Sequence, residues 1–170
     1  MRVVSNSSPL IYLAKAGKLE LLKRLFTIVL IPEAVYAEVV VRGIEKSQPE
    51  AVSVRRAVEA GWLRVEKSKP LAKLLEISGE IHAGETEAIS LAKKINAGLL
   101  LVDDAAARSI AEGYGLKVHG TVFVLLLALQ KKLLDKQEAK KTLNAFVSKG
   151  FRLAPEIYAR LWEEIEKYPQ

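Results

Sequence analysis

The sequence predicts an α/β fold, a three-layer α/β/α sandwich around a central parallel sheet, with a helical C-terminal extension. Short apolar segments alternate with stretches of helical periodicity, which is the pattern of parallel strands joined by helices. The segment 99–102 has no polar member, so both of its faces are expected to be buried in the middle of such a sheet. The fold class follows from these two observations.

The first half of the chain predicts three strands and several helices. Strands are expected at 2–5, 27–31 and 62–66, the last at an edge of the sheet. Ser7 or Ser8 can cap a helix that has Pro9 at its first position, where proline loses no hydrogen bond. Two short helices over 10–25 follow, then helices over 32–41, 48–60 and 71–77. Gly43 is expected to end the helix that Pro32 opens.

The second half predicts a helix that starts near Glu85, with Glu85 leading its apolar face and Glu87 on its solvent face. The central strand 99–102 is followed by a helix from Ala105, a short strand over 116–119 and an apolar helix over 122–134. Asp135 caps the next helix, and Pro155 opens the last one. We expect one domain over 1–130 and a helical extension over 131–170 that packs on it.

Composition narrows the class of partner. The 170 residues carry a formal net charge of +6, which fits a polyanionic partner. The absence of cysteine excludes disulfides and thiolate metal sites and suits a cytoplasmic protein, and two histidines disfavour zinc. No apolar run approaches membrane-spanning length and no signal peptide is visible, so no membrane association is expected.

Polar or acidic residues fall at the ends of predicted strands or on the helices that follow them: Asn6, Glu38, Glu85, Asp103 and Asp104. Open α/β sheets bind ligands at the carboxyl ends of their strands. Clustered carboxylates attract hard divalent cations, and a bound cation can activate water against a phosphodiester. The alternative for each acid is an ordinary structural role, as a helix cap, a rim residue or a complement to a helix dipole.

Five segments in order resemble a family. They are Ser5-Asn6-Ser7-Ser8-Pro9-Leu10-Ile11, then residues 31–39, Gly84-Glu85-Thr86-Glu87-Ala88-Ile89, Leu101-Val102-Asp103-Asp104 with Arg108, and Gly120-Thr121. Over about residues 1–130 the chain resembles a PIN domain, in the branch that starts with Ser-Asn/Asp-x-Ser-Pro-Leu-Ile. The resemblance implies a Rossmann-like parallel sheet and a Mg²⁺- or Mn²⁺-dependent ribonuclease acting on single-stranded or structured RNA. It also implies a toxin with an antitoxin protein as partner, and a homodimer.

The resemblance places the family's acids on Asn6, Glu38, Glu85 and either Asp103 or Asp104, and its usual hydroxyl on Ser7 or Ser8. Asn6 departs from the usual aspartate: an amide oxygen can ligate a cation but brings no charge and cannot act as a base. The alternative function is therefore a PIN-like module that has lost catalysis and binds RNA or a protein.

Five residues are expected to contact RNA phosphates or lie beside them. Arg108 follows the two aspartates, and Lys132, Lys136 and Lys140 recur at four-residue spacing, which predicts that they share one helix face. Ser8, in the first motif, completes the expected contact set. An ordinary solvated helix face is the alternative for the lysines.

Overall fold

The computed structural model describes residues 1–77, 79 and 81–169. Its sheet is parallel throughout, in the order β3-β2-β1-β4-β5. The strands are β1 (Val3–Ser5), β2 (Val29–Pro32), β3 (Leu63–Glu66), β4 (Leu99–Leu101) and β5 (Val118–His119). The predicted α/β/α sandwich is confirmed, and β3 forms an edge of the sheet as expected.

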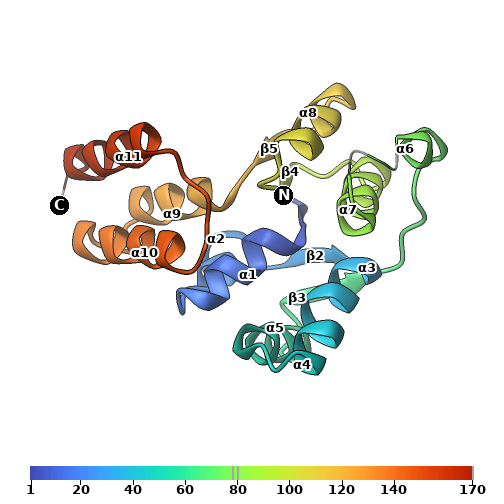
Figure 1. Ribbon diagram of the computed structural model, residues 1–170, viewed down its shortest axis with the longest axis horizontal. Helices are drawn as coiled ribbons and strands as arrows, with labels where there is room; N and C mark the ends of the chain where they lie inside the picture. Colours follow the sequence, from blue (N-terminus) through green and yellow to red (C-terminus); the bar gives the residue numbers. More distant parts are fainter. Residues whose placement is uncertain (78, 80, 170) are drawn as a thin grey trace.

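Helices follow the strands and cover both faces of the sheet (Figure 1). In the first half of the chain they are α1 (Ser7–Lys15), α2 (Glu20–Phe26), α3 (Glu33–Tyr36), the π-helix η1 (Ala37–Val41), α4 (Arg42–Glu45), α5 (Pro49–Glu59) and α6 (Ala72–Glu76). In the second half they are α7 (Ala83–Lys94), α8 (Ala105–Gly113), α9 (Thr121–Gln130), α10 (Lys136–Ser148) and α11 (Pro155–Lys167). Among the described residues, none of these helices is long and apolar enough to cross a membrane.

The side chains of the central strands are divided between two separate hydrophobic cores. Leu99 and Leu101 of β4 point into one core, whereas Leu100 and the following Val102 point into the other. Successive side chains of a strand face opposite sides of the sheet, so every side chain of a strand that is covered on both faces is buried and is expected to be apolar. This arrangement explains the uninterrupted apolar run.

The helices of the C-terminal extension share the larger core. Phe146 of α10 and Ile165 of α11 are fully buried in the same cluster as Val3 of β1 and Leu10 of α1. Figure 1 shows α9, α10 and α11 grouped on the side of the molecule opposite α6, α7 and α8. Residues 131–169 therefore lie against the sheet domain through a continuous core.

Gly43 does not end a helix. It lies inside α4, buried, and a methyl group added there would lie 2.7 Å from Cβ of Ala51 in α5. The glycine thus permits α4 and α5 to approach closely, and the helical segment runs on to Glu45. The prediction that it is a helix terminator was wrong because close packing and helix ending both select glycine.

The apolar helix predicted over 122–134 ends earlier, at Gln130. The chain turns at Lys132, whose φ is +57°, before Asp135 caps α10. Asp135 accepts a hydrogen bond from the backbone N–H of Glu138, and the Glu138 carboxylate accepts one from the N–H of Asp135. Lys132 therefore precedes α10, and the prediction that it shares a helix face with Lys136 and Lys140 was wrong.

Candidate active site

The order of strands in the sheet indicates where a ligand-binding site is expected. The chain builds β1, β2 and β3 outward in one direction and then crosses to the other side of β1 to build β4 and β5. The order therefore reverses between β1 and β4, and the crevice beyond the carboxyl ends of such a strand pair is the usual ligand site of an open α/β sheet. Asn6 follows β1 directly, and Asp103 and Asp104 follow β4.

Asn6 holds an acceptor that no described residue satisfies. The residue is 4 % exposed, and its Oδ1 has no hydrogen-bond partner among the residues that the structure describes. The backbone explains its fixed position, because the N–H of Asn6 donates to the carbonyl of Leu101 at 2.9 Å and α1 begins at the next residue. A buried acceptor left unpaired costs about 1–3 kcal/mol, so its presence here points to a ligand that supplies the missing bond.

Glu38, in the π-helix η1, has a carboxylate that lies near the Asn6 side chain. Its Oε2 accepts a hydrogen bond from the Ser7 hydroxyl at 2.6 Å. A methyl group added at Gly84 would lie 3.1 Å from this Oε2 and 3.4 Å from Asn6 Oδ1. Both oxygens thus face one spot on the first turn of α7. Single-turn π-helices often occur at functional sites, where the extra residue in the turn re-aims a side chain.

Glu85 adds a second carboxylate from α7. The side chain is 9 % exposed, and its Oε2 accepts a hydrogen bond from the backbone N–H of His82 at 2.7 Å. Burial, and then the negative charges of Asp104 and Glu38, raise the pKa of Glu85, against the lowering effect of the His82 hydrogen bond and charge. Glu85 therefore lies close enough to Asp104 and Glu38, which come from two other segments of the chain, for both of their charges to act on it.

The two adjacent aspartates do different things. Asp104 caps α8 by accepting a hydrogen bond from the N–H of Ala107 at 2.9 Å, and its charge acts on Glu85. Asp103 instead holds the start of α9: its Oδ1 accepts from the N–H of Thr121 at 2.7 Å and its Oδ2 from the Thr121 hydroxyl at 2.6 Å. Burial raises the pKa of Asp103, although these hydrogen bonds and the nearby Arg108 oppose the rise.

Glu87 does not face solvent as the sequence indicated. Its Oε2 accepts a hydrogen bond from the N–H of Ala34, at the start of α3, at 3.1 Å. Glu87 thereby ties α7, which carries Glu85, to the helical segment that carries Glu38. Sequence reasoning missed this contact because nothing local in the sequence shows that α3 packs on α7.

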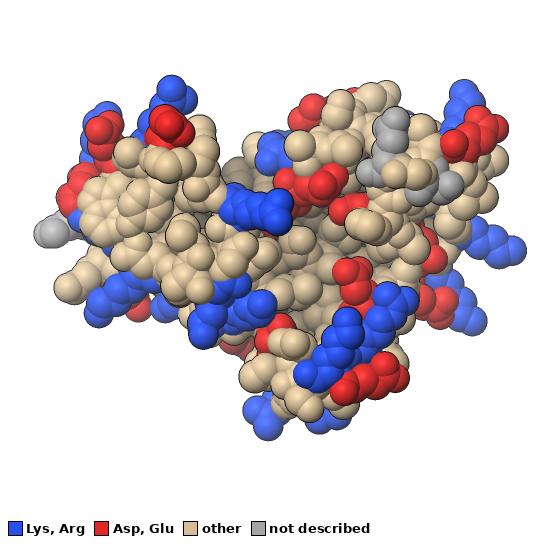
Figure 2. Space-filling model, viewed as in Figure 1, with Lys and Arg blue, Asp and Glu red and all other residues tan. Residues whose placement is uncertain are grey.

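Basic side chains lie next to the acidic ones on the face drawn in Figure 2. Arg108 is close enough to Asp103 and His119 for its charge to lower the pKa of both. Ser8 is half-buried in the first turn of α1, whereas its neighbour Ser7 makes the hydrogen bond to Glu38.

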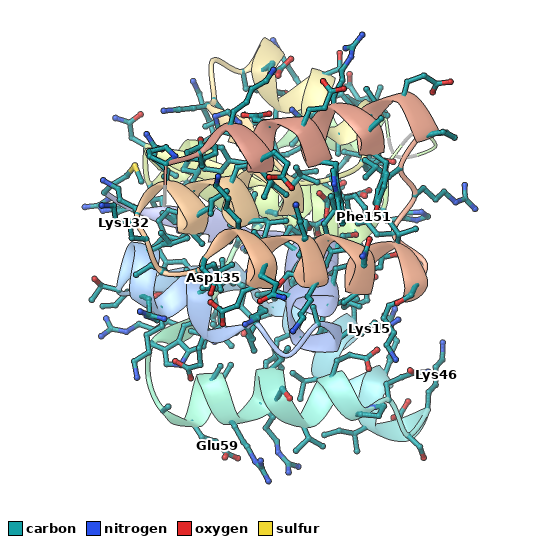
Figure 3. All side chains as sticks on the ribbon, turned by 90° about the vertical axis from the view of Figure 1, so that its left-hand side faces the viewer. Lys15, Lys46, Glu59, Lys132, Asp135 and Phe151 are labelled. Atoms are coloured by element: carbon teal, nitrogen blue, oxygen red, sulfur yellow. The ribbon has the colours of Figure 1, made fainter. Side chains whose placement is uncertain are left out.

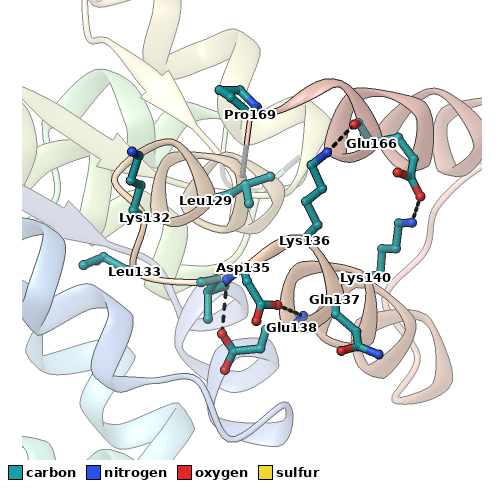
Figure 4. Close-up of a pocket in the computed structure, with 11 residues that line it drawn as sticks. Leu129, Lys132, Leu133, Asp135, Lys136, Gln137, Glu138, Lys140, Glu166 and Pro169 are labelled. Atoms are coloured by element: carbon teal, nitrogen blue, oxygen red, sulfur yellow. Dashed lines mark hydrogen bonds and ion pairs between the residues drawn. The ribbon is translucent and has the colours of Figure 1, made fainter.

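The three lysines lie elsewhere. Lys132, Lys136 and Lys140 line a pocket of about 840 Å³ at the C-terminal end of α9 (Figure 4). Asp103 binds the other end of α9, and a helix of its 10 residues spans about 15 Å. Lys136 donates to the carbonyl of Glu166 at 2.7 Å, and Lys140 pairs with the Glu166 carboxylate. Two of the three lysines thus join α10 to α11, and their contact with phosphates stays a prediction.

The oxygen atoms at this edge of the sheet are of the chemical type that hard divalent cations prefer. Asn6, Glu38, Glu85 and Asp104 offer amide and carboxylate oxygens, which Mg²⁺ and Mn²⁺ prefer. The described residues contain no group of three or more acidic, cysteine or histidine side chains placed to hold a metal ion by themselves. The oxygens that the structure brings closest to one spot are Glu38 Oε2 and the unpaired amide oxygen of Asn6, both beside Gly84.

Comparison with known proteins identifies the family of the chain. No curated protein and no solved structure matches the chain. A family model, DUF3368, described as a PIN domain, matches residues 2–167 and so spans the sheet and both C-terminal helices. On this match the chain belongs to the PIN-domain family.

Proposed function

We propose that the protein is a metal-dependent ribonuclease. Its PIN domain is a nuclease-type fold, and PIN domains generally use divalent metal ions. The observation that carries the proposal is the convergence of Asn6 Oδ1 and Glu38 Oε2 on the first turn of α7, where the charge of Asp104 also acts on Glu85. The basic net charge suits RNA as the partner.

Each residue then has a role that its surroundings support. Asn6, Glu38, Glu85 and Asp104 would hold Mg²⁺ or Mn²⁺, and the bound ion supplies an activated water and neutralises charge on the attacked phosphodiester. Ser7 keeps the Glu38 carboxylate turned toward Asn6 through its hydrogen bond. Asp103 fixes the start of α9, and with it the residues that follow β5.

The first prediction concerns cleavage. Incubated with an end-labelled single-stranded RNA and Mn²⁺, the protein is expected to cut, and EDTA is expected to stop cutting. Glu38→Gln and Glu85→Gln should each lower the rate by about 100-fold or more, since a lost ligand removes several kcal/mol of transition-state stabilisation. Glu59→Gln is the matched control, because it makes the same chemical change at an exposed side chain of α5 that is outside the site.

The Asn6 amide favours a second candidate, a PIN domain that binds RNA or a protein without cutting, because the site lacks one carboxylate there. The variant Asn6→Asp separates the two. Cleavage by the wild-type chain supports the enzyme, whereas cleavage that appears only in Asn6→Asp supports the binding module. Absence of cleavage in both would rule out the nuclease. The antitoxin partner and the homodimer stay predictions.

A further inference from the structure

A second cavity opens beside the acidic site. Its volume is about 290 Å³, near the lower limit for small-molecule pockets. His119 at the end of β5, Phe123 of α9 and Phe151 after α10 line it, together with Arg108, Arg152 and Asp103. The rest of its wall is apolar, with Ile157 and Leu161 of α11.

The rings in this cavity are already ordered. His119 and Phe123 stack face to face, with centroids 3.9 Å apart and ring planes 9° from parallel. Phe151, which also lines the cavity, packs edge-on against Tyr12. Burial, and then the charges of Lys117 and Arg108, lower the pKa of His119, which favours the neutral ring. Nucleic acid bases stack on such preformed aromatic surfaces in single-stranded RNA complexes.

The positive charges of Arg108 and Arg152 favour an anionic ligand in this cavity. Within the part of the chain that the structure describes, neither Arg108 nor Arg152 is ion-paired with a carboxylate, and Thr121 donates to both oxygens of Asp103. Two guanidinium groups at the rim of an aromatic cavity suit a base with its phosphate. Asp103 lines this cavity, and Asp104 of the acidic site is the next residue. An RNA strand bound across the acidic site would therefore also pass this cavity.

The lysine pocket is a different place. Figure 3 shows Lys132 and Asp135 at one end of α10 and Phe151 at the other. In the lysine pocket, carboxylates already engage Lys140 and the backbone of Asp135. The cavity beside Asp103 is therefore the better candidate for RNA.

We propose that this cavity holds one nucleotide of single-stranded RNA next to the bond that is cut, with its base against His119 and Phe123 and its phosphate against Arg108 and Arg152. The inference rests on the proposed function, since it names how that site would select its substrate. It also gives the C-terminal helices a role, because Arg152 and Ile157 come from the segment that joins α10 to α11 and from α11 itself.

Binding is measured without divalent cation, so that no RNA is cut. A fluorescein-labelled single-stranded 12-mer is titrated against the wild type, Arg152→Ala and the control Arg160→Ala, in which an exposed arginine of α11 outside the cavity is removed. Arg152→Ala is expected to weaken binding at least 5-fold more than the control and to reduce the slope of log K against log salt by about 0.7.

Stacking is tested with 2-aminopurine placed at successive positions of the RNA. Quenching is expected at one position in the wild type, to be lost in His119→Ala with about 5- to 150-fold weaker binding, and to be kept in His119→Phe, which restores a ring. A wild type that binds no RNA would overturn the proposed function itself. RNA that is bound and cut, with Arg152 and His119 variants equal to Arg160→Ala, would overturn only the assignment of the cavity.

Discussion

Glu85 carries a carboxylate where burial, and then the charges of Asp104 and Glu38, oppose ionisation. Its folded-state pKa lies above the ordinary 4.5, so the folded protein holds this proton more tightly than the unfolded chain does. The contribution of Glu85 to stability is therefore fully present below pH 4.5 and is lost as the pH rises through the folded-state pKa.

The variant Glu85→Gln tests this at the scale of one residue. Its amide is neutral at every pH and can still accept the hydrogen bond from His82, so the variant should be more stable than the wild type at pH 7. That advantage should vanish as the pH is lowered toward 4.5. Urea unfolding of both proteins across this range in EDTA gives the free energies, with Glu59→Gln, at an exposed side chain of α5, as control. A pH-independent difference would contradict the prediction.

Sequence reasoning could find some of these residues and not others. Asn6 and the Asp103–Asp104 pair could be placed at this edge from the sequence, because residues that follow a buried strand lie at the ligand-binding edge of the sheet. The sequence could not tell Asp103 from Asp104, because the direction of two adjacent side chains depends on where Thr121 comes to lie. The aromatic cavity was missed because its walls come from β5, α9 and the segment before α11.

At the scale of elements, α4 and α5 pack so closely that one methyl group decides the fit. Gly43→Ala would place Cβ 2.7 Å from that of Ala51, and overpacking of this kind is expected to cost about 1–3 kcal/mol of unfolding free energy. Gly113→Ala is the matched control, because a methyl group at this helix-end glycine meets nothing within 4 Å. It should be neutral or slightly stabilising.

The double variant Gly43→Ala/Ala51→Gly checks the cause. Removing the Ala51 methyl restores the space, so most of the lost stability should return in thermal unfolding. A double variant as unstable as the sum of both single variants would show that helix contact is not the reason. The sequence alone could not make this prediction, because both a helix end and a close helix contact favour glycine at position 43.

At the scale of the whole molecule, the chain has one tryptophan near each end of the fold. Trp62 is buried beside β3, and Trp162 is half-buried on α11. Because α10 and α11 share the larger core with the sheet, both ends are expected to unfold together. The single-tryptophan variants Trp62→Phe and Trp162→Phe, unfolded in urea, should give the same midpoint by fluorescence and by circular dichroism.

Phe146 links the two ends, and Phe146→Ala should lower both midpoints equally, at a cost of about 3–5 kcal/mol. Separate transitions would mean that residues 131–169 form an independent unit. The order of elements and an extension that packs on the domain could be predicted from the sequence, but the side chains that the two parts share in one core could not. The sequence shows which face of α10 and α11 is apolar and leaves open which surface it covers.

The unpaired oxygen of Asn6 bears on how this protein would respond to selection. A population of variants screened only for heat resistance should accumulate changes at Asn6, because any side chain that fills the space without a lone acceptor relieves the fold of an unmet bond. Such variants are expected to unfold at a higher temperature and to lose RNA cleavage in the presence of Mn²⁺. Selection for thermal stability and selection for activity therefore favour different residues at this position, which is 4 % exposed and lies one residue beyond β1.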